Sequence, residues 1–183
     1  METRSAKKLT GNVNKAVLAW AVAFGVTLFV LVLGVLPPFV DEPFRGFLMS
    51  GFSSFCHQIP TRSFHVDGVQ LALCHRCLGI YAGLPIAVVA FLGARRWDGF
   101  LSSRARYFIL ASLVPLGLDW LLDFLGIWSN TALSRLFTGS LFGLTAGYYL
   151  ARGIVSIGTS PDTGSASSAD RNQGDLLSTS LKS

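Results

Sequence analysis

Charged side chains are scarce in this sequence, which excludes an ordinary soluble fold. Only 14% of the 183 residues are Asp, Glu, Lys or Arg, whereas 51% are hydrophobic and 12% are aromatic. Soluble domains carry about 25% charged residues. Apolar stretches of roughly 20 residues cross a bilayer as helices. The sequence therefore predicts an integral membrane protein whose main partner is the lipid bilayer.

Four stretches with few charges are long enough to be spans. They lie at residues 16–36, 77–94, 107–128 and 135–153. The first ends at the Pro37-Pro38 pair, which cannot continue a helix. Because its apolar run is longer than that of a secretory signal peptide, we expect a span rather than a cleaved leader. The predicted fold is all-α, with a bundle of four transmembrane helices over residues 16–155.

Apolar residues are scarce at the end of the chain. Residues 156–183 consist mainly of Ser, Thr, Gly and Asp, which leaves almost nothing to bury. Such a composition does not compensate the entropy lost on ordering the chain. We therefore expect a disordered C-terminal tail.

Basic residues are concentrated in two places, and cytoplasmic segments carry the excess of Lys and Arg. One is the N-terminal segment, residues 1–15, and the other is the loop that holds Arg95, Arg96, Arg104 and Arg106. This distribution predicts a multi-pass protein of the cell (inner) membrane with both termini in the cytoplasm and an outer loop at residues 37–76. It also accounts for the net charge of +5 without a nucleic-acid partner.

Cysteine is scarce too, and all three cysteines lie in one part of the chain. Cys56 is in the outer loop, whereas Cys74 and Cys77 stand where the second span begins. No histidine follows Cys77, which excludes the CxxCH attachment of haem. If that helix begins near Gln70, Cys74, Cys77 and Tyr81 share one face of its first turns. The helix N-terminus would then lower the pKa of the thiols.

These thiols permit several chemistries. With a histidine, the cysteines form a Cys3His set, and Cys56, His57, Cys74 and Cys77 predict a zinc site. We favour His57 over His75, because His75 would point away from the cysteines around the helix. As an alternative, Cys74 and Cys77 form the dithiol of a membrane thiol-disulfide oxidoreductase that passes electrons to a quinone. A thioredoxin-like βαβ frame is absent, which favours the metal. A structural disulfide and buried free thiols that serve only as packing are two further alternatives.

The third span carries two carboxylates, Asp119 and Asp123, at i and i+4. Ionisable residues within a span are costly and mark functional candidates. Arg135, at the start of the fourth span, is the expected partner of one of them. Asp123 lies nearer the interface, where we expect a solvated carboxylate. This intramembrane charge pair also raises a third alternative, a small transporter subunit.

Two further patterns concern packing. In the fourth span, Gly139, Gly143 and Gly147 recur every fourth residue, which predicts close approach of another helix and offers a face for a homo-oligomer. Before Cys56, the segment EPFRGFLMSGFSSF has phenylalanines at spacings of three and four. This spacing predicts a short amphipathic helix at the outer membrane interface.

Three separated segments, CHQIPTRSF, LCHRCLGIYAG and GLDWLLDFLGIWSNTALSRLFTGSLFG, resemble the domain of unknown function 2085 family of small multi-pass prokaryotic membrane proteins. The resemblance covers about residues 45–150. It implies the motif positions Cys56, His57, Arg62, Ser63, Cys74, Arg76, Cys77, Gly79, Tyr81, Gly83, Asp119, Arg135, Thr138 and Gly139. It implies no reaction. The residues expected to form a ligand-binding or structural pocket are Arg62, Arg76, Tyr81, Asp119, Asp123, Arg135 and Thr138.

Overall fold

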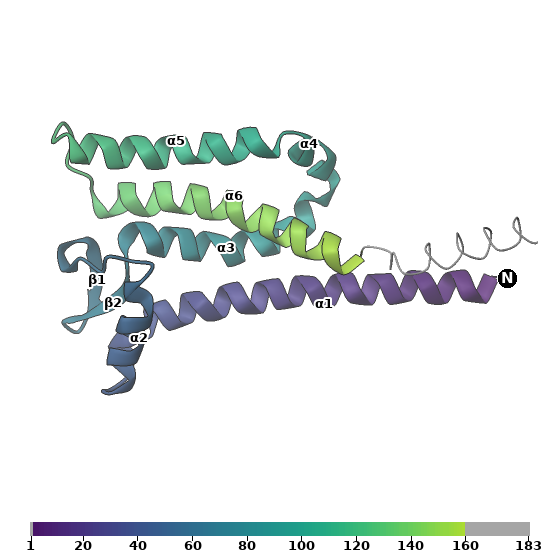
Figure 1. The fold of residues 1–183 in the computed structure, drawn as a ribbon, viewed down its shortest axis with the longest axis horizontal. Helices are drawn as coiled ribbons and strands as arrows, with labels where there is room; N and C mark the ends of the chain where they lie inside the picture. The colour runs from purple at the N-terminus through teal and green to yellow at the C-terminus, as the bar shows by residue number, and fades with distance from the viewer. Residues whose placement is uncertain (1, 160–183) are drawn as a thin grey trace, which may run out of the picture.

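Four long helices run side by side in the computed structural model, which describes residues 2–159 (Figure 1). They are α1 (Glu2–Val35), α3 (His75–Ala94), α5 (Ala105–Phe124) and α6 (Ala132–Thr159). Shorter elements lie at the ends of this bundle: α2 (Phe44–Ser53), α4 (Asp98–Ser103) and the 3-10 turns η1 (Pro37–Phe39), η2 (Pro60–Arg62) and η3 (Arg95–Trp97). Helix α6 continues past residue 156, where we expected the tail to begin; residues 160–183 lie outside the described residues.

Three helical segments within residues 2–159 are long and apolar enough to cross a membrane. They are Asn14–Val35, His75–Ser103 and Ala105–Phe124. The predicted count of four spans is not confirmed, because α6 is long enough but too rich in Gly, Ser and Thr to qualify. Helix α6 packs against α1, α3 and α5, so much of its surface faces protein. A helix enclosed in this way needs less apolar surface than one that faces lipid.

The glycines of α6 allow it to lie directly against α3. A Cβ atom on Gly139 or Gly143 would overlap the carbonyl oxygens of Arg76 and Ile80, which belong to α3. On the other side of the contact, Gly79 and Gly83 face the backbone of α6. The face that we predicted for a second copy of the protein is therefore occupied within the chain.

The end of the bundle near α4 holds the main apolar core. Its buried members come from α1, α3 and α6 and are Ala23, Ala87, Val88, Phe91, Tyr148, Ala151 and Val155. Polar contacts close this end, because Tyr148 Oη and Arg152 Nε donate hydrogen bonds of 2.8 and 2.9 Å to Asp98 Oδ1. The core therefore fixes the helices at the end opposite the cysteines (Figure 1).

The segment between α2 and α3 contains a β-hairpin, which we did not predict. Strands β1 (Ser63–Val66) and β2 (Val69–Cys74) pair antiparallel around a turn at Asp67 and Gly68. Both turn residues have positive φ, of 50° and 78°, as a two-residue hairpin turn requires. Because residues 69–74 pair with β1, helix α3 begins at His75 and not near Gln70.

Candidate metal centre

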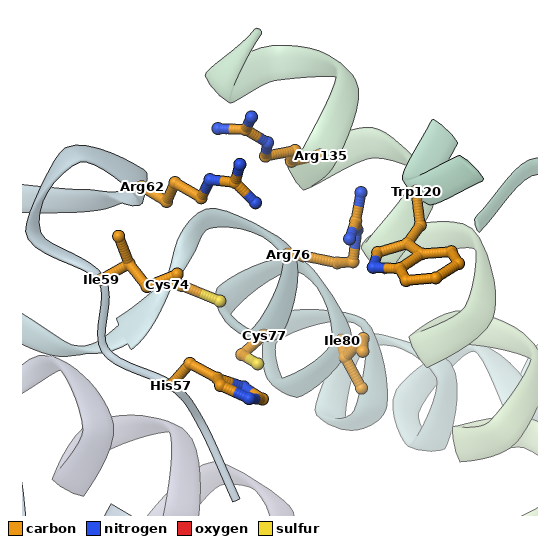
Figure 2. Close-up of a pocket in the computed structure, with 9 residues that line it drawn as sticks. All are labelled: His57, Ile59, Arg62, Cys74, Arg76, Cys77, Ile80, Trp120 and Arg135. Atoms are coloured by element: carbon orange, nitrogen blue, oxygen red, sulfur yellow. The ribbon is translucent and has the colours of Figure 1, made fainter. Parts of the chain in front are cut away.

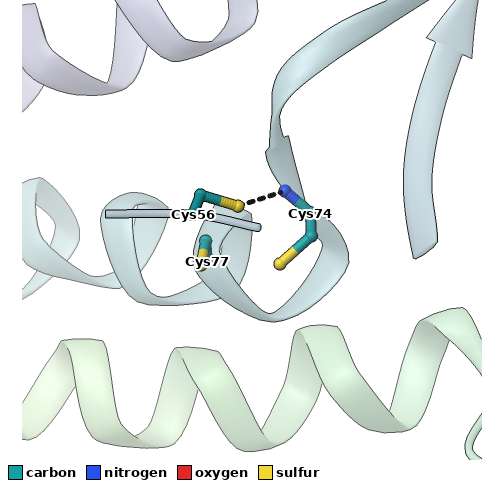
Figure 3. Close-up of side chains that lie close together, drawn as sticks. All are labelled: Cys56, Cys74 and Cys77. Carbon is teal, nitrogen blue, oxygen red and sulfur yellow. Dashed lines mark hydrogen bonds between the residues drawn. The ribbon is translucent and has the colours of Figure 1, made fainter. Parts of the chain in front are cut away.

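Three cysteines from a loop, a strand and a helix meet at the N-terminal end of α3 (Figure 3). Cys56 follows the end of α2, Cys74 ends β2 and caps α3, and Cys77 lies in the first turn of α3. Their Sγ atoms all lie within 4.8 Å of one another, and all three thiols are free. Cys74 precedes the helix, so the predicted helical face of Cys74, Cys77 and Tyr81 is wrong. Cys74 instead occupies the N-cap position of α3, three residues before Cys77 in the first turn.

The immediate surroundings favour the thiolate form of Cys74. The thiols of Cys56 and Cys77 donate hydrogen bonds to it and hold its pKa well below the usual range. The backbone N–H of Cys74 in turn donates to Cys56 Sγ at 3.2 Å. A thiolate is the form of cysteine that binds metals and acts as a nucleophile. The cluster can therefore act as a metal ligand set or as a redox group.

Two glutamines hold the loop that carries Cys56. Gln58 Nε2 donates to the carbonyl oxygens of Met49 and Ala72 at 2.8 and 3.1 Å, which joins α2 to β2. Gln70 Nε2 donates to the carbonyl oxygen of Gln58 at 2.7 Å and to Ser63 Oγ at 3.1 Å. Sequence analysis missed both glutamines, since no spacing marks a glutamine that bonds to distant backbone. They fix the position of Cys56 relative to Cys74.

Neither neighbouring histidine belongs to the cluster of sulfur atoms. Within the described residues, the group of ligand atoms consists of the three cysteines alone. The exposed side chain of His57 lines the cavity beside Cys74 and Cys77. The ring of His75 is buried and meets the ring of Phe64 edge-on, with 4.3 Å between ring centroids. The role of His57 as the fourth ligand stays a prediction.

Three arginines near the cysteine cluster form ion pairs with the two carboxylates of α5. Arg76 pairs with Asp119, whereas Arg62 and Arg135 approach Asp123 at 3.1 and 3.6 Å. The expected pairing of Arg135 with one of the two aspartates thus occurs at Asp123. We expected a solvated carboxylate at Asp123, but its side chain is only 18% exposed. The η2 turn brings Arg62 to it, a contact that the sequence alone did not indicate.

Asn130 contacts the same two aspartates from the loop before α6. Its side-chain Nδ2 donates to the carbonyl oxygen of Asp119 at 2.6 Å, and its backbone N–H lies 3.4 Å from Asp123 Oδ1. Asn130 is buried. No pattern in the sequence singles it out, because isolated asparagines are common in loops.

A cavity of about 350 Å³ opens between the cysteines and the arginines (Figure 2). It is lined by His57, Ile59, Arg62, Cys74, Arg76, Cys77, Ile80, Trp120 and Arg135. Four residues predicted for this pocket, Asp119, Asp123, Thr138 and Tyr81, are not among its lining residues. The two aspartates instead pair with the arginines that line it. Thr138 donates its hydroxyl to the carbonyl oxygen of Ser134 at 2.9 Å, within α6. Tyr81 lines a separate apolar cavity with residues of α1 and α2.

The fold and this site describe a helical membrane protein with thiols and arginines gathered at one end of its bundle. The chain belongs to the family described as predicted membrane protein (DUF2085), whose model matches residues 56–149. The matched segment begins at Cys56 and contains every residue that lines the cavity. The family description names no activity, so membership supports a membrane protein but no reaction.

One curated relative is an uncharacterised protein of Methanocaldococcus jannaschii. The two sequences are 32% identical over 103 residues, which is 56% of this chain and 65% of the relative. The chain therefore spans somewhat less than two thirds of that protein's length. No solved structure matches this chain.

Proposed function

We propose that the protein is a multi-pass membrane protein that binds a zinc ion through Cys56, Cys74 and Cys77. The observation that carries the proposal is the convergence of three thiols from separate elements to within 4.8 Å. In a tetrahedral site with Zn–S bonds of about 2.3 Å, sulfur atoms lie about 3.8 Å apart. Small side-chain rotations would bring the cluster to that geometry. Thiolates also favour zinc over Mg²⁺ or Ca²⁺, which prefer oxygen ligands.

Three thiolates leave one position of a tetrahedral ion open. His57 is our candidate for that position, because it follows Cys56 directly and its exposed side chain borders the cavity. A closed Cys3His set is typical of structural zinc, whereas an open fourth position would accept water or a ligand. In the structural role, zinc would tie the end of α2 and the β-hairpin to α3.

The site faces the outside of the cell in this proposal, with α6 as a fourth span and both termini in the cytoplasm. Arg95, Arg96, Arg104 and Arg106 are all exposed near α4, at the end opposite the cysteines (Figure 1). An excess of basic residues on one side marks the cytoplasmic face. The enclosure of α6 by α1, α3 and α5 supports its assignment as a span despite its polar residues.

A thiol-disulfide oxidoreductase is the second candidate. The lowered pKa of Cys74 favours it, since a thiolate is the attacking form. In this alternative, Cys74 and Cys77 are oxidised to a disulfide, and their two electrons, with one proton from Cys77 and one from water, reduce a quinone to a quinol. We do not extend the proposal to transport, because Asp119 and Asp123 are both engaged by arginines.

Metal analysis and thiol counting on the same purified protein test the proposal. We expect one zinc per chain and three free thiols once the protein is denatured in chelator. The variants Cys56→Ser, Cys74→Ser and Cys77→Ser should each lose most of the zinc, since each removes one of three sulfur ligands. In the redox alternative, wild type contains a Cys74–Cys77 disulfide and no metal, and Cys56→Ser behaves as wild type. Full zinc retention in all three variants would end the metal proposal.

A further inference from the structure

Three arginines from separate elements line the cavity beside the cysteines. Arg62 comes from η2, Arg76 from the first turn of α3 and Arg135 from the first turn of α6. Figure 2 shows their side chains around the same space as Cys74 and Cys77. The β-hairpin and the contact between α3 and α6 thus gather three guanidinium groups that are far apart in the sequence.

The arginines exceed their carboxylate partners in charge and in hydrogen-bond donors. Among the described residues, the three guanidinium groups pair with two carboxylates, Asp119 and Asp123, so this arginine–aspartate group carries one excess positive charge. Each guanidinium has five N–H donors, and none of its nitrogens accepts a hydrogen bond. The donors not used by the two carboxylates are available to other acceptors.

One of these donors is buried without a protein partner. The Nε–H of Arg76 has no acceptor among the described residues and no contact with solvent. The side chains of Arg76 and Arg135 are only 20% and 12% exposed, so water reaches them poorly. A buried unsatisfied donor costs about 1–3 kcal/mol, and more where the group is charged. A small rotation of the Arg76 side chain that turns this N–H toward an anion in the cavity would recover that free energy.

We propose that this cavity binds a ligand that carries a phosphate group, held by Arg62, Arg76 and Arg135. Guanidinium groups present a planar fork of donors that matches phosphate oxygens and strengthens the hydrogen bonds through charge. The volume of about 350 Å³ falls at the lower end of the range for small-molecule pockets. The cavity therefore has room for the group to which the phosphate is attached. The proposal does not depend on a bound metal, because its donors are the arginines alone.

The phosphate can arrive from water or as the headgroup of a membrane lipid. Ile80 and Trp120 give the cavity an apolar wall, and Trp120 is 53% exposed on α5. Helix α5 is one of the membrane-span candidates and buries little of its surface in the protein, so this wall adjoins lipid. A lipid with a phosphomonoester headgroup would use both sides of the cavity, with its phosphate at the arginines and its acyl chains along α5. Inorganic phosphate would use the arginines only.

Thermal unfolding of the full-length protein in detergent tests this pocket, since a ligand that binds only the folded state raises the unfolding temperature. One arm adds inorganic phosphate, with chloride at equal ionic strength as its control. The other adds phosphatidic acid, with diacylglycerol of the same acyl chains as its control. Stabilisation by inorganic phosphate identifies the headgroup as sufficient, whereas stabilisation by phosphatidic acid alone identifies a lipid ligand. Each of these results supports the pocket.

Substitutions connect the stabilisation to the arginines. We expect Arg62→Gln to weaken binding of the stabilising probe roughly tenfold, through loss of charge-assisted hydrogen bonds. The side chain of Arg62 is 44% exposed, so this variant should fold. Arg96→Gln removes the same charge from the exposed loop at the other end of α3 and should bind as wild type does. Wild-type protein stabilised by neither probe, or Arg62→Gln that binds as tightly as wild type, overturns the proposal.

Zinc content, measured on the same samples, separates this proposal from the metal site. Arg62→Gln should keep its zinc while it loses phosphate affinity. Protein that lacks zinc but still binds phosphate contradicts the metal proposal and supports the pocket. Protein that holds zinc but is stabilised by neither probe supports the metal proposal and contradicts the phosphate pocket.

Discussion

Arg76 and Asp119 form an ion pair that joins the first turn of α3 to α5, and both side chains are largely buried. Asp119 is further held through its carbonyl oxygen, which accepts a hydrogen bond from Asn130. Helix α5 has few other buried residues; Ser112 is its one fully buried position among the described residues. The ion pair is therefore a principal attachment of α5 to the end of the bundle that carries the cavity.

Removal of one partner of this ion pair should destabilise the fold. Asp119→Asn leaves the guanidinium of Arg76 buried without its counter-charge, and the expected loss is about 2 kcal/mol or more in the free energy of unfolding. Asp41→Asn makes the same chemical change at an exposed position and should have almost no effect. Denaturant unfolding in detergent measures both variants. Equal stability of the two would mean that the ion pair does not hold α5.

The contact between α3 and α6 gives a second prediction. Gly143→Ala places a methyl group against the carbonyl of Ile80, so the helices must separate, and we expect a loss of about 1–3 kcal/mol. Gly117→Ala on α5 has no atom within 4 Å of the new methyl group. It should stabilise the protein by up to about 1 kcal/mol through helix propensity. Unfolding temperatures that move in the same direction would argue against close packing at Gly143.

The sequence predicted the helical part of the fold well, because length and hydropathy determine spans directly. The spans at residues 16–36, 77–94 and 107–128 lie within or overlap three helical segments long enough to cross a membrane. The fourth, α6, is long but carries glycines where it meets α3. Hydropathy cannot show that other helices enclose α6, because enclosure depends on packing rather than on composition.

The hairpin before α3 was not predicted. Because the prediction lacked it, Cys74 was placed within the helix instead of at the end of β2. Leu71, Ala72 and Leu73 form a continuous buried run instead of the alternating pattern of a half-exposed strand. The pair Asp67-Gly68 is a hairpin turn signal that the sequence does contain. One ion pair of the site was missed as well. The sequence predicted Arg62 as a pocket residue and Arg135 as the partner of an aspartate, but it did not indicate that the η2 turn brings Arg62 to Asp123.

His57 and His65 provide a matched pair for the fourth zinc ligand. Both histidines are exposed in the segment between α2 and α3, but only His57 lines the cavity beside Cys74 and Cys77. If His57 completes the site, His57→Ala should lower zinc affinity at least tenfold, because one of four ligands is lost. His65→Ala should retain wild-type affinity. Competition with a chromophoric chelator measures both. Equal affinities would leave the fourth position to water or another ligand.

The orientation of the protein is tested by labelling on intact cells. Val66→Cys places a thiol in the hairpin, which we expect outside, and Ser103→Cys places one in the basic loop that we expect inside. Both positions are exposed, so membrane sidedness determines their access to a membrane-impermeant maleimide. Wild-type protein gives the background from its own cysteines. We expect Val66→Cys to label above that background before lysis, and Ser103→Cys only after lysis. The reverse pattern would place the cysteine cluster in the cytoplasm, where a reduced thiolate site needs no protection from oxidation.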